Sequence, residues 1–180
     1  MRRRPVLWLL MLLALPRAAR AQEPPAELQG SLPGARLLGS GRLRFMGLHI
    51  YDARLWAGTP PPGSDWAATP FALELIYGRA LSGERIAERS LTEMKRQGDI
   101  AEPVATRWLA TMKQLFPDVK EGDRITGLNV PGSGARFFVN GALRGEPRDA
   151  DFARVFFGIW LSPRTSEPAL REALLGGKAP

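Results

Sequence analysis

The sequence predicts an α+β domain with a mainly antiparallel sheet that helices cover on one face. Three observations support this class: strand-like segments come first, they return after two amphipathic helical segments, and further helical segments close the chain. Separate blocks of strands and helices are typical of α+β domains, whereas regular alternation would favour a parallel sheet. The chain also lacks the glycine-rich motifs of nucleotide-binding proteins.

The first strand-like region spans residues 35–57, with Gly39-Ser40-Gly41 as a break or bulge inside it. The proline-rich segment 59–65 predicts a loop. The segment from Phe71 to Tyr77 is apolar at most positions and predicts a third strand.

Two helices are expected next. Ser82 is a candidate N-cap for a helix that runs to Lys95. Its apolar positions recur at helical spacing and are Ile86, Ser90 or Leu91, and Met94. Pro103 suits the first turn of a second helix, and Pro117 ends it. The apolar stripe of this second helix consists of Trp108, Leu109, Met112, Leu115 and Phe116.

The chain then returns to strands over 123–130 and 135–139. Asn140-Gly141 is a strong signal for a tight hairpin that leads into 142–145. Asp149 or Asp151 is expected to cap a mostly apolar helix that reaches Trp160, and a short helix over 167–175 follows.

The N-terminus has the features of a secretory signal peptide. Arginines precede an apolar run, and Ala19-Arg20-Ala21 has the small-x-small pattern of a cleavage site. We therefore expect a signal peptide over 1–21, a flexible lead-in over 22–35, one domain over 36–177, and a periplasmic or secreted location. An uncleaved N-terminal anchor is the alternative, although the run is shorter than the roughly 20 residues that span a bilayer.

Charge and composition exclude several function classes. The leader holds five arginines and no acid, so its removal lowers the formal charge from +7 to +2. A domain with so little net charge lacks the cationic patch that nucleic acid requires. The chain has no cysteine, which excludes disulfides, thiolate catalysis and the common structural zinc sites. We expect no cofactor, no metal, no nucleic acid partner and no membrane span in the mature chain.

The candidate functional residues lie on the first strands. Arg42 and Arg44 carry forked cations that bind carboxylates or enolate oxygens, and Tyr51 can donate its hydroxyl to the same anion. Strict alternation places both arginines opposite Tyr51, whereas a bulge at Gly47 would bring them to its face. His49 is the only histidine, and such a residue is more often structural than catalytic. Solvated arginines and a structural tyrosine are the plain alternative.

Five blocks of the chain resemble, in order, those of the bacterial exported branch of the chalcone isomerase-like family. Together they cover about residues 36–175. They are Gly41-Arg42-Leu43-Arg44-Phe45-x-Gly47-x-x-Ile50-Tyr51-Asp52-Ala53-x-Leu55-Trp56, Leu81 to Ser90, Phe116-Pro117-Asp118-Val119, Phe137-Phe138-Val139-Asn140-Gly141, and Phe156 to Pro163. The resemblance implies a curved sheet with helices packed over it and a ligand cleft between the two layers.

The resemblance also implies site residues. In plant chalcone isomerases an arginine stabilises the developing oxyanion, and it corresponds to Arg42 or Arg44, while a strand threonine corresponds to Tyr51. On the first covering helix, a tyrosine, a lysine and an asparagine of the enzymes correspond to Ile86, Arg89 and Glu93. A carboxylate at Glu93 would repel an incoming phenolate.

Three functions follow from these residues. The first is a carrier or sensor of a small amphipathic anion, a fatty acid or an aromatic acid, because the fatty-acid-binding relatives pair an arginine with a tyrosine. The ligand tail would then lie along Phe45, Leu73, Leu75, Ile86 and Met94. The second is an isomerase or intramolecular lyase in which arginine stabilises an enolate and Tyr51 relays a proton. The third is an interaction module, which exposed Trp66 or Trp108 would favour.

Overall fold

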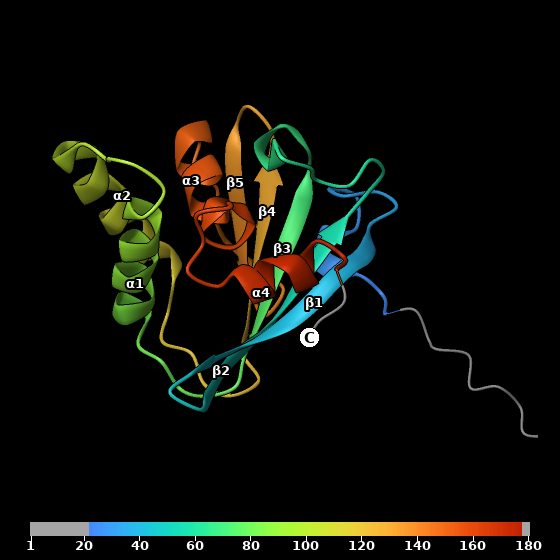
Figure 1. Cartoon of the computed structure of the whole chain (residues 1–180), viewed down its shortest axis with the longest axis horizontal. Helices are drawn as coiled ribbons and strands as arrows, with labels where there is room; N and C mark the ends of the chain where they lie inside the picture. Colours follow the sequence, from blue (N-terminus) through green and yellow to red (C-terminus); the bar gives the residue numbers. More distant parts are fainter. Residues whose placement is uncertain (1–21, 178–180) are drawn as a thin grey trace, which may run out of the picture.

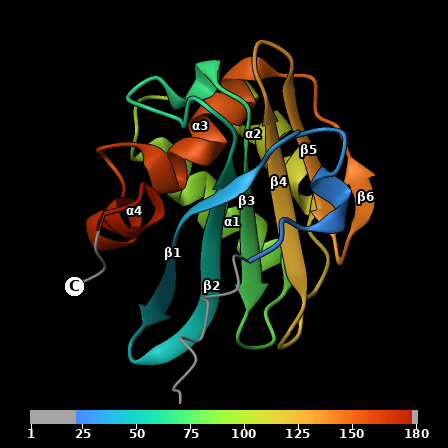
Figure 2. The ribbon, with the colours of Figure 1, turned by 90° about the vertical axis from the view of Figure 1, so that its right-hand side faces the viewer.

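The computed structural model describes residues 22–177, so the expected signal peptide over 1–21 lies outside the described residues. Within 22–177, six strands form one antiparallel sheet in sequential order. They are β1 (Arg36–Phe45), β2 (Leu48–Ala57), β3 (Phe71–Tyr77), β4 (Arg124–Val130), β5 (Gly134–Val139) and β6 (Ala142–Gly145). Figure 2 shows the sheet curving along its strands. The predicted α+β class is confirmed.

Helices cover one face of the sheet, as Figure 1 shows. They are α1 (Gly83–Lys95), α2 (Glu102–Leu115), α3 (Ala150–Leu161) and α4 (Pro168–Leu174). α3 packs on β4 and β5, and α4 packs on β1 and β2. α1 packs mainly against α2 and α3 rather than directly on the sheet. Among the described residues no helix is long and apolar enough to cross a membrane.

The helix boundaries follow from local sequence. Pro103 lies in the first turn of α2, and the carboxylate of Asp149, one of two predicted caps, accepts the Phe152 N–H at 2.9 Å. The stripe of α2 is buried except at Leu109, which is half-buried, and Trp108 is only 5% exposed. A buried Trp108 and a partly buried Trp66 do not form the exposed surface that an interaction module would need.

The strand-like region 35–57 forms the two strands expected before Phe71–Tyr77, but the chain turns at Met46-Gly47 rather than at Gly39-Ser40-Gly41. Met46 and Gly47 form the turn between β1 and β2, with φ angles of +49° and +78°. Two positive φ values are typical of the tight turns that match the twist of paired strands. Met at such a position is unusual, so the turn carries little sequence signal.

Gly39 and Gly41 let α4 approach β1 closely. A Cβ on Gly39 would collide with the Ala173 carbonyl oxygen, and one on Gly41 would lie 2.6 Å from Leu170 Cδ1. The register of β1 and β2 also shifts between Leu37 and Gly39, so the predicted bulge lies at this end of the segment. The glycines thus fix how α4 lies over the sheet.

Residues 22–35 were expected to be a flexible lead-in, and the structure corrects this for most of the segment. The 3-10 helix η1 (Ala26–Leu28) and the residues after it pack on the sheet face that the α-helices leave open. Leu28 and Leu32 are 1% and 4% exposed against Trp56, Leu128 and Phe138. Their apolar side chains shield this face of the sheet from water, which is favourable because it buries apolar surface.

The segment also completes a buried ionic network. Arg124 Nη2 lies 2.9 Å from Glu27, and Arg124 Nη1 lies 3.2 Å from Glu74. The side chains of both glutamates are only 2% exposed. Trp56 Nε1 donates a further hydrogen bond to Glu74 at 2.9 Å. Such buried charges are tolerated only when they are paired in this way.

Candidate ligand-binding site

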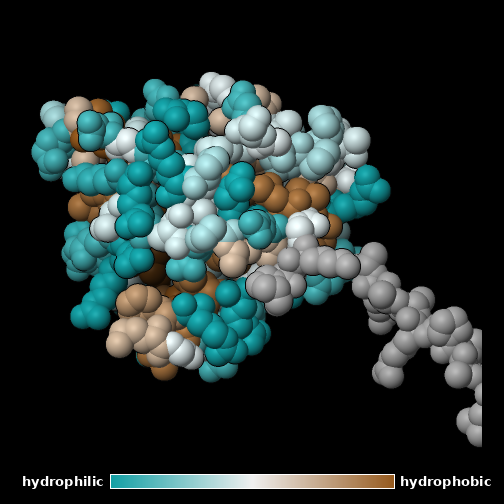
Figure 3. All heavy atoms as spheres, viewed as in Figure 1, coloured by the Kyte–Doolittle hydropathy of each residue, from teal (hydrophilic) through white to brown (hydrophobic). Residues whose placement is uncertain are grey.

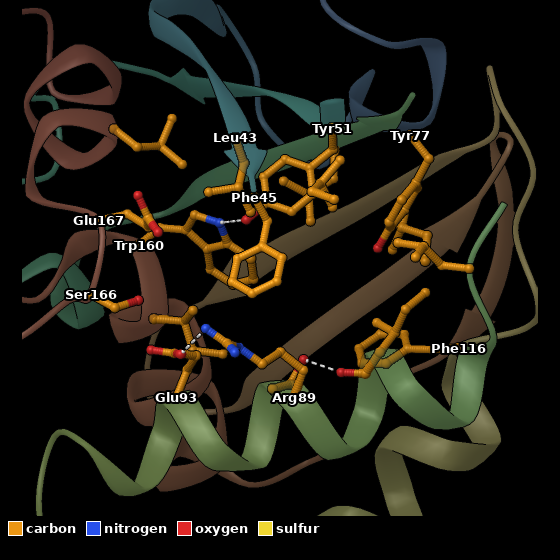
Figure 4. A pocket seen from close by; sticks show the side chains of 18 of the residues that line it. Leu43, Phe45, Tyr51, Tyr77, Arg89, Glu93, Phe116, Trp160, Ser166 and Glu167 are labelled. Carbon is orange, nitrogen blue, oxygen red and sulfur yellow. Dashed lines mark hydrogen bonds and ion pairs between the residues drawn. The ribbon is translucent and has the colours of Figure 1, made fainter. Parts of the chain in front are cut away.

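A cavity of about 290 Å³ lies between α1, α3 and the β1–β3 side of the sheet (Figure 4). The cavity forms because α1 packs against α2 and α3 rather than on the sheet, which leaves space between α1 and the strands. Its lining is mostly apolar and aromatic. The residues that line it are Leu43, Phe45, Ile50, Tyr51, Leu75, Tyr77, Leu81, Arg85, Ile86, Arg89, Ser90, Glu93, Phe116, Ile125, Phe156, Ile159, Trp160, Thr165, Ser166, Glu167 and Leu170.

A bulge in β2 determines which strand residues reach this cavity. Leu43 pairs with Tyr51, but Arg44 pairs with His49, so Ile50 is the extra residue. Both Ile50 and Tyr51 therefore line the cavity, while His49 moves to the opposite face. Gly47, three residues earlier, is the position at which a bulge would have brought Arg42 and Arg44 to the face of Tyr51, and it lies in the hairpin turn instead.

Tyr51 and Tyr77 place two phenol groups in the cavity wall. Trp160 Nε1 donates to the Tyr51 hydroxyl at 3.0 Å, and the two tyrosine rings meet edge to face at 6.0 Å (Figure 4). Burial raises the pKa of both phenols well above the usual value, and the Trp160 hydrogen bond opposes this for Tyr51. Among residues 22–177 the Tyr77 hydroxyl has no hydrogen-bonding partner, so it is available to a ligand.

Most charged groups of the cavity come from α1. Arg89 Nη2 lies 2.7 Å from Glu93 Oε1, and Arg96 Nε lies 3.5 Å from Glu93 Oε2. The Glu93 side chain is 8% exposed, whereas that of Arg89 is 62% exposed. Two cations thus face one buried carboxylate, although Arg96 lies outside the cavity lining, and the four charged residues of the lining, Arg85, Arg89, Glu93 and Glu167, balance. Arg85 lies on the same rim, and Glu167 adds one negative charge.

Arg42 and Arg44 do not line the cavity. Leu43 and Phe45 alternate with them and take the inward face of β1, and Arg44 pairs across the strands with His49. Arg42 instead bonds Asp52, with Nη2 at 3.1 Å from Oδ2, and this bond lowers the pKa of Asp52. The strand arginine that the family resemblance implied, Arg42 or Arg44, is therefore not at the cavity, whereas Arg89, which the same resemblance implied on the first helix, lines it together with Arg85.

The other sequence-derived residues divide into two groups. Tyr51, Ile86, Arg89 and Glu93 meet at the cavity, as do Phe45 and Leu75. Leu73 and Met94 are buried in the core outside the lining. His49 lies outside it too, with a buried Nε2 that has no hydrogen-bonding partner among the described residues and lies 3.5 Å from Asp52.

Sequence reasoning missed Tyr77, Arg85 and Trp160. Tyr77 shares the inward face of β3 with Leu75, so alternation carried a signal for it. Trp160 follows Phe156 by four residues on α3, which is the spacing of one helix face. Its hydrogen bond to a residue 109 positions away had no local signal.

Comparisons with known proteins give the family and a shared fold. Residues 48–176 match the family model described as chalcone isomerase-like. An uncharacterized protein of Haemophilus influenzae is 26% identical over 143 residues, which cover 77% of this chain and 67% of that protein. The crystal structure of a fatty-acid binding protein of Arabidopsis thaliana superposes with a TM-score of 0.62 at 16% identity. The match covers 80% of this chain and 88% of the plant chain, and it shows a shared fold.

Proposed function

Because the chain belongs to the chalcone isomerase-like family, we propose that it is an exported protein that binds a small fatty acid or aromatic acid without turnover. The observation that carries the proposal is the meeting of two guanidinium groups, Arg85 and Arg89, and two phenols at a single apolar cavity. The plant neighbour is itself a fatty-acid binding protein. A cavity of about 290 Å³ is at the lower end of ligand pockets, which favours a short acyl chain or one aromatic ring.

The ligand carboxylate would lie at the rim, beside Arg89 and Arg85. Its tail would then lie inward against Leu75, Phe116 and Phe156, which are all buried. Each buried methylene contributes about 0.8 kcal/mol, and a hydrogen bond to a charged group contributes about 1.5–3 kcal/mol. The Tyr77 hydroxyl can satisfy a polar group deeper in the ligand.

Two features favour binding over catalysis. The raised pKa keeps Tyr51 protonated at neutral pH, so it is a poor proton acceptor there. Arg89 is already held by Glu93, which reduces its ability to stabilise a developing oxyanion. An isomerase is the alternative, and the unpartnered Tyr77 hydroxyl is the observation that favours it. Faster loss of naringenin chalcone with the protein than without it, abolished by Tyr77→Phe, would support that alternative.

Calorimetric titration with a medium-chain fatty acid and an aromatic acid tests the binding proposal. Arg89→Gln is expected to weaken binding about ten- to hundredfold, because it removes a charge-assisted hydrogen bond. Arg42→Gln is the matched control, since it removes an arginine from the opposite strand face, and it should leave affinity unchanged. No binding of either acid, or equal loss in both variants, would contradict the proposal.

A further inference from the structure

The tip of the β1–β2 hairpin gathers exposed apolar side chains. The large hydrophobic side chains that are exposed within residues 22–177 are those of Phe45, Met46, Leu48 and Leu143, and the first three belong to this tip. They are 55%, 86% and 51% exposed. Figure 3 shows apolar residues at this lower end of the molecule, beneath a hollow beside α1. An apolar patch that folding leaves in water marks an interaction site.

The tip is continuous with the candidate ligand-binding cavity. Phe45 is more than half exposed, and it also lines the cavity (Figure 4). Across the rim, the exposed lining residues are Arg85 and Arg89 of α1 and Glu167, which precedes α4. A surface that covers the tip therefore also meets the entrance to the cavity.

The charges around the tip indicate what kind of surface this is. Arg44 is the penultimate residue of β1, and Arg79 follows Gly78, whose N–H donates to the Ile50 carbonyl of β2 at 2.9 Å. Within the described part of the chain, neither these two arginines nor Arg85 forms an ion pair. Apolar side chains beside unpaired cations complement a bilayer that carries anionic headgroups.

We propose that the β1–β2 hairpin tip docks on an anionic lipid bilayer, and that the ligand enters and leaves the cavity past Phe45 at that surface. The ligand in this proposal is the one of the proposed function, so the second half of the proposal rests on it. The two-residue turn is narrow, so Met46 and Leu48 can enter the headgroup region of a bilayer directly. A bilayer needs no preformed groove to receive them. An amphipathic acid is concentrated at the same interface, which places it next to the rim.

Vesicle co-sedimentation of the purified protein tests the docking. We expect binding to vesicles of phosphatidylcholine mixed with phosphatidylglycerol, with weaker binding to phosphatidylcholine alone and at high salt. Leu48→Asp is expected to reduce binding about tenfold or more. Leu143→Asp is the matched control, since Leu143 is 54% exposed on β6 and lies away from the tip, and it should bind as the unmodified protein does.

Two further variants separate apolar from ionic contributions. Met46→Asn removes an apolar side chain at a position with a positive φ, which Asn tolerates well, so the fold is retained and binding falls severalfold. Arg44→Gln should reduce binding to the mixed vesicles and remove part of the salt dependence. Each variant should still bind the acid in solution, because none of these residues lines the cavity.

The proposal is overturned by any of three results. The first is that the protein does not bind vesicles at low salt, and the second is that Leu48→Asp and Leu143→Asp lose vesicle binding equally. The third is a concentration-dependent dimer that forms without vesicles and that Leu48→Asp abolishes, which would assign the tip to a second copy of the chain. Vesicle binding without acid binding in solution would instead refute the proposed function and leave the docking surface standing.

Discussion

Glu93 controls how much positive charge the cavity offers to a ligand. Its carboxylate lies 2.7 Å from Arg89 Nη2 and therefore competes with any ligand carboxylate for that guanidinium. The change Glu93→Gln keeps the shape and the accepting oxygen but removes the negative charge. In the unmodified protein, a ligand carboxylate about 4 Å from the Glu93 carboxylate would be repelled by about 4 kcal/mol at an effective dielectric constant of about 20. The Arg89 side chain is 62% exposed, so water screens most of this, and we expect a gain of about 1 kcal/mol in binding.

Calorimetric titration measures this gain directly. The dissociation constant for a medium-chain fatty acid should fall about fivefold in Glu93→Gln, and the effect should shrink as salt rises. The alcohol with the same tail carries no charge, so its affinity should be equal in both proteins. Unchanged or weaker binding of the acid, with binding of the alcohol intact, would refute the placement of the ligand headgroup beside Arg89.

Three further predictions concern the surrounding structure. Arg124→Met leaves Glu27 and Glu74 buried without this partner, so urea unfolding should show a loss of about 3 kcal/mol, and a loss below about 1 kcal/mol would contradict the buried network. Gly39→Ala should lower the free energy of unfolding by about 1–3 kcal/mol, because the new Cβ would collide with the Ala173 carbonyl. Gly63→Ala is the control and should lower it little, since no atom lies near that Cβ. Equal losses in the two variants would argue against the close approach of α4. The chain has two tyrosines and both line the cavity, so tyrosinate absorbance should appear only well above pH 10. Because folding raises both tyrosine pKa values, the neutral phenols contribute a free energy of folding that is complete below about pH 10 and is lost as pH rises through the folded pKa values. Reversible titration of the tyrosines near pH 10 without unfolding would contradict their burial.

The sheet and helices were largely predictable from the sequence because hydrophobic periodicity and caps act locally. Phe71–Tyr77 is a strand with the bounds expected, and Asn140-Gly141 forms the predicted hairpin, with φ angles of +50° and +87°. The Met46-Gly47 turn was missed, since Met carries no turn signal. The ordered N-terminal segment was missed as well, because its contacts are with strands far along the chain.

The candidate site was predictable only in part. The family pattern on the first helix indicated Ile86, Arg89 and Glu93, and all three line the cavity. The same pattern on the strands could not decide the faces of Arg42 and Arg44, because the face of a strand residue depends on bulges. The bulge at Ile50 follows from pairing with β1 and has no signal within β2 alone.

Native mass spectrometry of the protein purified from its own host tests the central claim most directly, since it reports what the cavity holds. We predict one bound amphipathic acid per chain, retained in Arg42→Gln and lost in Arg89→Gln. A bare protein that also fails to take up added fatty or aromatic acids would contradict the claim.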